Sequence, residues 1–185
     1  EVFDEKRNKF FRFGECERFL FLNDKNEMVG KIALFINKKY KQKQPTGGFG
    51  FFDCIHHQET ANFIFDFSRD FLQNKGMEAM DGPINFGERD KFWGLLIDGF
   101  SEPLYAMNYN PPYYKELFEN YGFQIYFNQL CFSRKIHSPV AENFLEMHAR
   151  ISKNENISAK RKKVKDLEKF ANDFTEVYNK AWAYH

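Results

Sequence analysis

The sequence predicts an α/β (α+β) fold in which a mixed, mostly antiparallel sheet packs against helices. Residues 18–36 indicate a hairpin, because two apolar stretches flank the turn-forming residues 23–26. Residues 47–80 then follow the order strand, loop, helix, strand, which is typical of a parallel crossover. Residues 110–128 predict a further helix and strand, with Gly122 between them.

The predicted crossover contains the strand that we expect inside the sheet. Glycines in residues 47–55 permit a bulge or the close approach of another backbone. A helix then carries an apolar stripe and ends at residues 74–76, before a short parallel strand over 77–80. The stripe consists of Ala61, Ile64, Phe65, Ser68, Phe71 and Leu72.

The predicted second helix begins with a capping asparagine. Asn110 is a good N-cap residue, and Pro111 suits the first helical position. The apolar residues Tyr114, Leu117, Phe118 and Tyr121 recur at i, i+3, i+4 and i+7. After Gly122, apolar and polar residues alternate over 123–128, so we expect a strand with one buried face.

The chain changes character after Phe132. A helix is predicted from Ser138 to about Ile151, a basic strand or arm over 157–164, and another helix over 166–182. We therefore expect a first domain over residues 1–135 and a C-terminal helical extension over 136–185. The first residue is not Met and the last helix lacks a stop signal, so the sequence suggests a fragment of a longer protein.

Composition argues against several functional classes. The formal net charge is +1, which favours neither nucleic acid nor a membrane surface as a partner. No apolar run approaches the roughly 20 residues of a membrane helix, so we expect a cytoplasmic protein. Cys16, Cys54 and Cys131 are odd in number and far apart, which predicts reduced thiols and argues against a disulfide or structural metal site.

The passage from Leu117 through Glu119 to Gly122 and Phe123 resembles the end of the GNAT (N-acetyltransferase-like) superfamily fold. The resemblance covers roughly residues 10–135 and implies a sheet with helices on both faces, without the opening strand and helix of that fold. The strand and helix predicted after residue 157 resemble the start of a second such unit, as in a tandem protein. A homodimer or a second unit would then be a partner.

The resemblance implies transfer of an acyl group from acetyl-CoA or another acyl-CoA to a small-molecule or peptide amine. Phosphate suits the start of the crossover helix, where free N–H groups and the helix dipole attract anions. Two departures are Phe118 at the position of the family's tyrosine acid and Phe63 in the phosphate loop. The implied coenzyme contacts are the backbone near Cys54, Ile55 and His56, then Gln58, Thr60 and Ala61, and finally Asn110.

Acyl transfer needs a base for the amine and an acid for the leaving thiolate. Asp53, at the end of the central strand, is the candidate base, and Glu88 is a weaker candidate on the long connection over 82–110. That connection is predicted to form a lid or an acceptor-binding surface, because loops of this length are usually functional. Tyr113 lies off the apolar stripe and is the candidate acid.

Other interpretations remain open. Cys54 and His56 share one face of an extended segment and His57 the other, which leaves too few ligands for zinc, so a buried thiol is favoured. A catalytically inactive binding module of the same fold would also explain Phe118 and Phe63. An aminoacyl-tRNA-dependent transferase of this fold is a further alternative.

Overall fold

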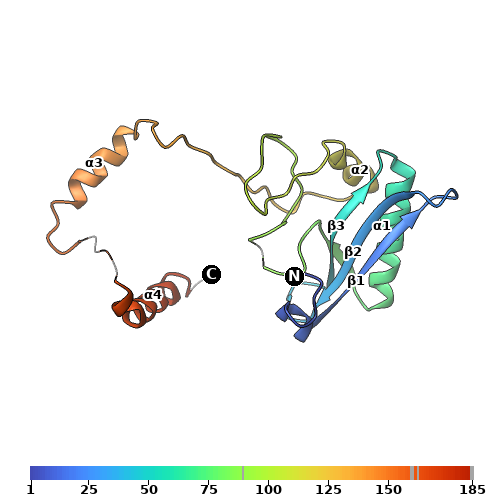
Figure 1. Ribbon diagram of the computed structural model, residues 1–185, viewed down its shortest axis with the longest axis horizontal. Coiled ribbons are helices and arrows are strands. Elements are labelled where there is room, and N and C mark those ends of the chain that lie inside the picture. The colour runs from blue at the N-terminus through green and yellow to red at the C-terminus, as the bar shows by residue number, and fades with distance from the viewer. Residues whose placement is uncertain (89, 159–160, 162, 184–185) are drawn as a thin grey trace. The chain divides into compact units, whose positions relative to one another are not determined.

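The computed structural model describes residues 1–88, 90–158, 161 and 163–183, and it separates the chain into two units (Figure 1). Unit 1 is Glu1–Asn128 and unit 2 is Gln129–His185. Among the described residues, no helix is long and apolar enough to cross a membrane.

Unit 1 is built on a sheet with the strand order β1-β2-β3-β4. The strands are β1 (Gly14–Leu22), β2 (Met28–Asn37), β3 (Thr46–Cys54) and β4 (Ala79–Asp81). β1 and β2 form the predicted antiparallel hairpin, β2 and β3 are also antiparallel, and β3 and β4 are parallel. The prediction of a mixed, mostly antiparallel sheet with an internal third strand is therefore confirmed.

Helix α1 (Gln58–Asn74) connects β3 to β4 and covers one face of the sheet. It begins before the apolar stripe because His57 acts as the N-cap, its Nδ1 accepting from the backbone N–H of Thr60 at 3.4 Å. Gly76, at φ +83°, follows the end of the helix as predicted. The stripe residues Ile64 and Phe65 are fully buried against the strands.

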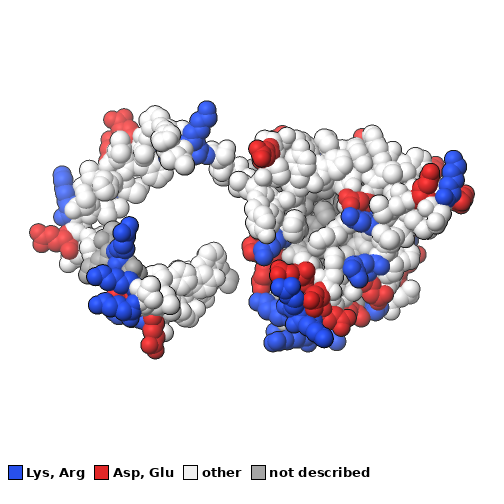
Figure 2. Space-filling view, in the orientation of Figure 1, with Lys and Arg blue, Asp and Glu red and all other residues white. Residues whose placement is uncertain are grey.

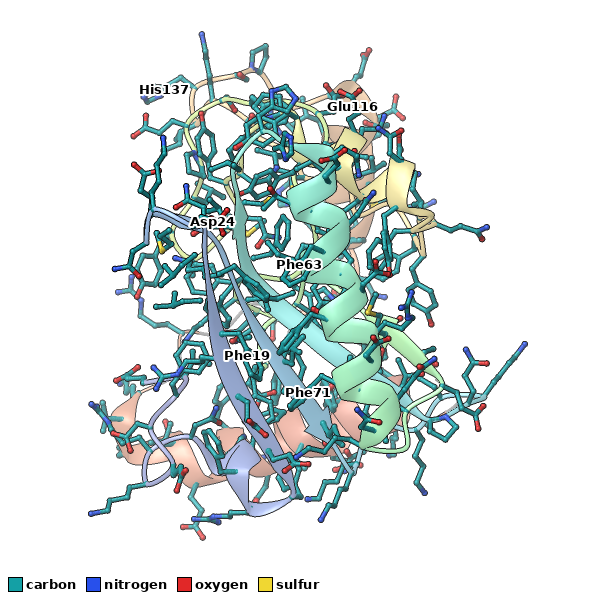
Figure 3. All side chains as sticks on the ribbon, turned by 90° about the vertical axis from the view of Figure 1, so that its right-hand side faces the viewer. Phe19, Asp24, Phe63, Phe71, Glu116 and His137 are labelled. Atoms are coloured by element: carbon teal, nitrogen blue, oxygen red, sulfur yellow. The ribbon has the colours of Figure 1, made fainter. Side chains whose placement is uncertain are left out.

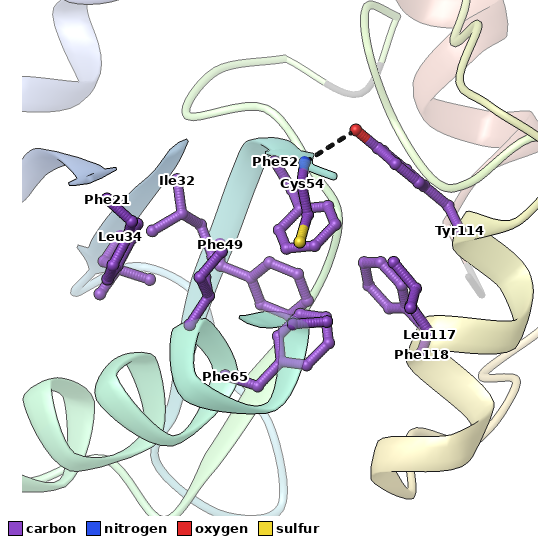
Figure 4. Packing of buried hydrophobic residues seen from close by; sticks show 12 residues of the cluster. Phe21, Ile32, Leu34, Phe49, Phe52, Cys54, Phe65, Tyr114, Leu117 and Phe118 are labelled. Carbon is purple, nitrogen blue, oxygen red and sulfur yellow. Dashed lines mark hydrogen bonds between the residues drawn. The ribbon is translucent and has the colours of Figure 1, made fainter. Parts of the chain in front are cut away.

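Aromatic rings form the core of unit 1 (Figure 4). Phe65 of α1 stacks on Phe52 of β3, with ring centroids 5.1 Å apart, and its edge meets Phe118 at 4.9 Å. Phe118 belongs to helix α2 (Tyr114–Tyr121) and also stacks on Phe49. The second helix therefore joins the same core as α1.

The other face of the sheet is covered differently. Phe86, from the connection after β4, packs there against Phe35 of β2 and against Phe10 of the 3-10 helix η1 (Lys9–Arg12). In unit 1, the expectation of helices on both faces is therefore wrong, because α1 and α2 share one aromatic core and an irregular segment with η1 fills the opposite side.

The start of α2 differs from the prediction. Its N-cap position is Tyr113, and Asn110 does not cap it. Instead, the Asn110 amide accepts from the N–H of Leu96 at 2.9 Å and donates to the carbonyl of Leu96 at 3.1 Å. The two prolines form a turn, closed by Tyr114 N–H donating to the carbonyl of Pro111 at 3.1 Å. The asparagine is thus used to hold the long connection.

The end of α2 agrees with the prediction, but the strand after it does not form. Gly122 has φ +110°, and Phe123 N–H donates to the carbonyl of Phe118, closing the helix. Phe123 packs against Phe49 and Phe65. Residues 124–128, all of them described, are exposed and belong to no strand, because their backbone pairs with no neighbouring strand.

Unit 2 contains α3 (Glu142–Ile151), the 3-10 helix η2 (Val164–Asp166) and α4 (Leu167–Ala181). α4 matches its prediction, whereas α3 begins at Glu142 and not at Ser138. Residues 159, 160 and 162 of the predicted basic strand or arm lie outside the described residues, and the described remainder of 157–164 forms no strand. Every residue of α3 and α4 is described, and none is buried.

Candidate functional site

The end of β3 is the point where the sheet opens. β4 pairs with β3 only from Thr46 to Gly48. Further along, Ile55 N–H donates to Val29 in β2, so the alternation of the strand directs the N–H and C=O of Cys54 toward the other edge. This edge, between the last residues of β3 and the start of α1, is the candidate site.

A bulge in β3 precedes this opening. Lys31 pairs with Asp53 and Ala33 with Gly50, so β3 contains one residue more than β2 over the same stretch. Phe51, which lies in this bulge, has a left-handed backbone conformation with φ +52°. A Cβ at Gly50 would collide with the carbonyl oxygen of Ile84, which explains the glycine. The predicted bulge and close backbone approach are both confirmed.

Two adjacent hydroxyls satisfy the peptide groups of Cys54. The N–H of Cys54 donates to Tyr114 Oη at 3.0 Å, the contact drawn in Figure 4. The hydroxyl of Tyr113 donates to the carbonyl of Cys54 at 2.9 Å. These residues, here called the tyrosine pair, hold the start of α2 on the edge of β3 in the place where a neighbouring strand would pair.

Asp53 belongs to the same hydrogen-bond network. Tyr114 O–H donates to Asp53 Oδ1 at 3.2 Å, and Lys31 Nζ lies 2.6 Å from Asp53 Oδ2. Lys31 is the cross-strand neighbour of Asp53 on the sheet face away from α1. Each carboxylate oxygen of the candidate base therefore has one partner and keeps a second lone pair that can accept a proton.

The tyrosine pair remains protonated at neutral pH. Burial is the main cause that raises the pKa of Tyr113, and the nearby Cys54 and Asp53 raise it further. Burial likewise raises the pKa of Tyr114. The ring of Tyr113 also stacks on His56, with centroids 4.3 Å apart. Tyr113 therefore keeps its hydroxyl proton at neutral pH, as a general acid must.

Gln58 joins α1 to α2. Its amide nitrogen donates to the carbonyl of Leu117 at 3.1 Å and to Asn62 at 2.8 Å, while its oxygen accepts from Asn120 at 3.1 Å. These contacts occupy the side chain that the sequence assigned to phosphate. The backbone at the start of α1 is therefore the anion-binding element that remains.

The other residues expected at the start of α1 differ in accessibility. Thr60 lies at the surface, with its hydroxyl 3.0 Å from His57 Nδ1, whereas Ala61 is fully buried in the core. Ile55 is partly exposed beside the end of β3. Of the predicted contacts, Ile55, His56 and Thr60 are therefore accessible to a ligand at this helix start.

A shallow concavity of about 290 Å³ lies beside the same helix start. Phe63 is 64% exposed there, and its ring meets Phe21 edge-on at 6.0 Å. Figure 3 shows Phe63, Phe19 and Phe71 along the side of α1 that faces β1. Phe63 thus forms part of an open wall and is not a core residue. The concavity is lined by Phe21, Leu22, Asn23, Val29, His57, Glu59, Thr60 and Phe63.

Two predicted site residues have other contacts. Glu88 lies beside the N-terminal segment, where its carboxylate is 2.7 Å from Lys9 Nζ. Asn110 binds the backbone of Leu96, as described above. Sequence reasoning did not identify Lys31 or the role of the Tyr114 hydroxyl. The register of the predicted hairpin with the third strand is the signal that would have found Lys31.

Cys54 is not poised as a nucleophile. It is 5% exposed, and burial raises the pKa of its thiol to about 11. At neutral pH it is therefore a thiol and not the reactive thiolate. In the part of the chain that the structure describes, no group of three His, Cys, Asp or Glu side chains could hold a metal ion.

No family model matches the sequence, and no curated protein or solved structure is detectably similar to the chain. What the site can do is therefore inferred from its own geometry.

Proposed function

We propose that unit 1 is a GNAT-like domain that transfers an acyl group from acyl-CoA to an amine by direct attack. The observation that supports this most strongly is the course of β3: it is bulged, it crosses over α1 to a parallel strand, and it parts from that strand before Cys54. Such an opening leaves this peptide edge without a partner strand, so that an extended acyl-pantetheine arm would pair there in place of the tyrosine pair, with the N-terminus of α1 beside it for pyrophosphate.

In this proposal each residue of the site has one task. The N–H of Cys54 stabilises the oxyanion that forms on the thioester carbonyl. Asp53 accepts the proton of the attacking amine. Tyr113, whose raised pKa keeps it protonated, donates its proton to the leaving thiolate.

The tyrosine pair must shift for the reaction to occur. The oxyanion needs the N–H of Cys54, which now donates to the hydroxyl of Tyr114. The hydroxyl of Tyr113 donates to the carbonyl of Cys54. Binding of the acyl-pantetheine arm would exchange these hydrogen bonds for its own. The proposal therefore includes a small displacement of the start of α2 when the donor binds.

The test is calorimetric titration of the 185-residue chain with acetyl-CoA. Thr60→Glu adds a negative charge at the start of α1, where the helix dipole tolerates it but a pyrophosphate is repelled. Gln73→Glu adds the same charge at the exposed far end of α1 and serves as the matched control.

We expect micromolar binding that Thr60→Glu weakens at least tenfold and Gln73→Glu leaves unchanged. Absence of binding at millimolar acetyl-CoA, or equal affinity for both variants, would contradict the proposal.

An inactive binding module is the second candidate, and a specific observation favours it. Phe118 replaces the tyrosine acid of the resembled family and is 5% exposed in the aromatic core, so it has no catalytic chemistry. Release of free CoA in the presence of a panel of amines separates the candidates. If Tyr113→Phe abolishes this release but not the binding of acetyl-CoA, the enzyme is supported; binding without any release supports the module.

The aminoacyl-tRNA alternative is less well supported. On the face of unit 1 shown in Figure 2, acidic and basic side chains are interspersed, with both signs present around the N-terminal segment. A nucleic-acid donor would instead be expected to use a broad basic surface. A compact donor such as acyl-CoA agrees better with this distribution.

A further inference from the structure

The outer edge of β1 is an unpaired strand edge. β1 comes first in the strand order, so in the described part of the chain only its side toward β2 is paired. The carbonyl of Phe13 accepts from the N–H of Lys38, so the alternation of the ladder turns the N–H and C=O groups of Cys16, Arg18 and Leu20 outward. These outward groups have no backbone partner among the described residues.

The second half of β1 lacks the charges and prolines that usually protect a strand edge. Residues 19–22 are all apolar. Leu20 is 67% exposed, on the sheet face that carries its cross-strand neighbour Lys31, and Leu22 is 53% exposed. An open edge of this kind is a template for pairing with another extended chain.

Aromatic side chains of α1 lie beside this edge. Phe19 of β1 meets Phe67 and Phe71 of α1 edge-on, at 4.8 and 5.2 Å. These three rings are only half-buried, and Phe63, one turn before Phe67, is largely exposed (Figure 3). The concavity of about 290 Å³ lies at the end of this row, between Phe63 and Phe21. A strand added to β1 would place every second side chain against these rings.

The first half of β1 carries an excess of negative charge on the same face. Lys75 Nζ lies 3.0 Å from Glu15 and 3.3 Å from Glu17. Neither carboxylate has another ion-pair partner in the described part of the chain, so the two share one ammonium group. Arg18 lies on the opposite face, 5.0 Å from the ring centre of Phe3. This half of the edge therefore attracts a basic side chain from a neighbouring strand.

We propose that the outer edge of β1 binds an extended peptide segment, which adds a strand antiparallel to β1. The segment is apolar opposite Phe19–Leu22 and basic opposite Glu17 and Glu15. Its backbone pairs with the outward N–H and C=O groups, and its side chains contact the aromatic row. In such strand addition, backbone hydrogen bonds supply affinity and side-chain contacts supply selectivity. The surface is distinct from the opening at Cys54 and does not depend on acyl transfer.

The test uses a fluorescein-labelled peptide of eight residues. Its sequence is valine, isoleucine, valine, isoleucine, threonine, lysine, threonine and lysine, which places the lysines opposite Glu17 and Glu15. Fluorescence anisotropy is followed as the full 185-residue chain is added. We expect saturable binding in the micromolar range that weakens as salt is raised, because the lysine contacts are exposed.

Two N-methylated versions of the peptide are matched controls. The third, fifth and seventh amides lie opposite Leu20, Arg18 and Cys16, so they face β1 in the proposed register. Methyl groups on these three amides should weaken binding at least tenfold, because they remove the hydrogen bonds to the edge. Methyl groups on the second, fourth and sixth amides, which face away, should weaken it less than threefold.

Two further measurements use the chain itself. In amide hydrogen exchange followed by NMR, the outward amides of Cys16, Arg18 and Leu20 should gain protection when the unmodified peptide binds. Glu17→Gln removes a charge opposite a lysine and should weaken the peptide at least threefold at low salt. Glu116→Gln, at an exposed position of α2, is the matched control and should leave the affinity unchanged.

Absence of saturable binding, equal binding of the two N-methylated versions, or protection confined to other amides would overturn the proposal. Self-association would also overturn it. If sedimentation velocity shows a dimer without peptide, and the outward amides of β1 are already protected in that dimer, a second copy of the chain occupies the edge.

Discussion

Helices α1 of unit 1 and α4 of unit 2 have similarly clear apolar stripes, but only α1 buries one. Ile64 and Phe65 of α1 are fully buried, whereas Phe174 and Val177 of α4 are 60% and 66% exposed. α1 lies on a sheet whose strands come from other parts of the chain. An apolar period therefore specifies a helix and the face it offers, while burial depends on whether the fold provides a partner for that face.

The contacts within the two helices support this distinction. In α4, Phe174 meets Phe170 and Tyr178 one turn away on the same helix, at 6.3 and 6.1 Å. Phe65 of α1 instead meets Phe52 of β3 and Phe118 of α2. Unit 1 is stabilised by contacts distant in sequence, and the helices of unit 2 show contacts close in sequence.

The largest expected difference concerns one phenylalanine from each helix. Phe65→Ala should destabilise unit 1 by about 3–5 kcal/mol, because it empties a core position that cannot fully collapse. Phe174→Ala should change stability by no more than about 0.5 kcal/mol, as expected for an exposed position. Urea unfolding followed by circular dichroism measures both. A large loss for Phe174→Ala would show that α4 buries its stripe in solution, and the contrast between the units would disappear.

The two units should also differ in the reactivity of their cysteine thiols. Cys54 in unit 1 is buried with its pKa raised from 9.0 to about 11, which lowers its thiolate fraction about a hundredfold at pH 8. Cys131 in unit 2 is exposed. Iodoacetamide should therefore label Cys131 rapidly and Cys54 slowly, as followed by mass spectrometry. Equal rates in the native protein, both as fast as in urea, would be inconsistent with the buried core.

The raised pKa of Cys54 also makes the stability of unit 1 depend on pH. The thiol form of Cys54 is favoured by folding, so its contribution is fully present below pH 9 and is lost as pH rises toward about 11. Cys54→Ala should reduce the alkaline loss of stability in that window, relative to Cys131→Ala as control.

Removal of one tyrosine hydroxyl from each unit should give a smaller difference in stability. Tyr114→Phe leaves the buried N–H of Cys54 without an acceptor and should cost about 1–3 kcal/mol. Tyr178→Phe, on the exposed stripe of α4, should have no measurable effect. Thermal unfolding of the two variants tests this. If Tyr114→Phe were as stable as the parent, the tyrosine pair would not hold α2 on β3.

Ion pairs should give the smallest difference. Lys31 and Asp53 connect two strands at 2.6 Å with both side chains about half exposed, and a double-mutant cycle should give no more than about 1 kcal/mol. Lys180 and Glu176 pair within α4 and should give about 0.3 kcal/mol. Both values should fall in 1 M salt. A coupling of several kcal/mol for Lys31 would indicate that Asp53 is far less solvated than its exposure suggests.

Part of the candidate site could be predicted because its residues are close in sequence. Asp53, Cys54, His56 and Gln58 fall at the junction of a predicted strand and helix, so any fold with that crossover brings them together. Their hydrogen-bond partners could not be predicted in the same way. Gln58 and Cys54 bind α2 across about 60 residues of chain, and no local pattern encodes these contacts.

The sequence by itself determined the hairpin, the crossover through α1, the end of α2 at Gly122 and the extent of α4, because periodicity and backbone preferences act over a few residues. The tertiary structure decided the rest. Asn110 binds Leu96 and does not cap α2, because the long connection offers it two backbone partners. Residues 124–128 form no strand although they alternate, because a strand needs a neighbour to pair with, and that neighbour is a property of the whole fold.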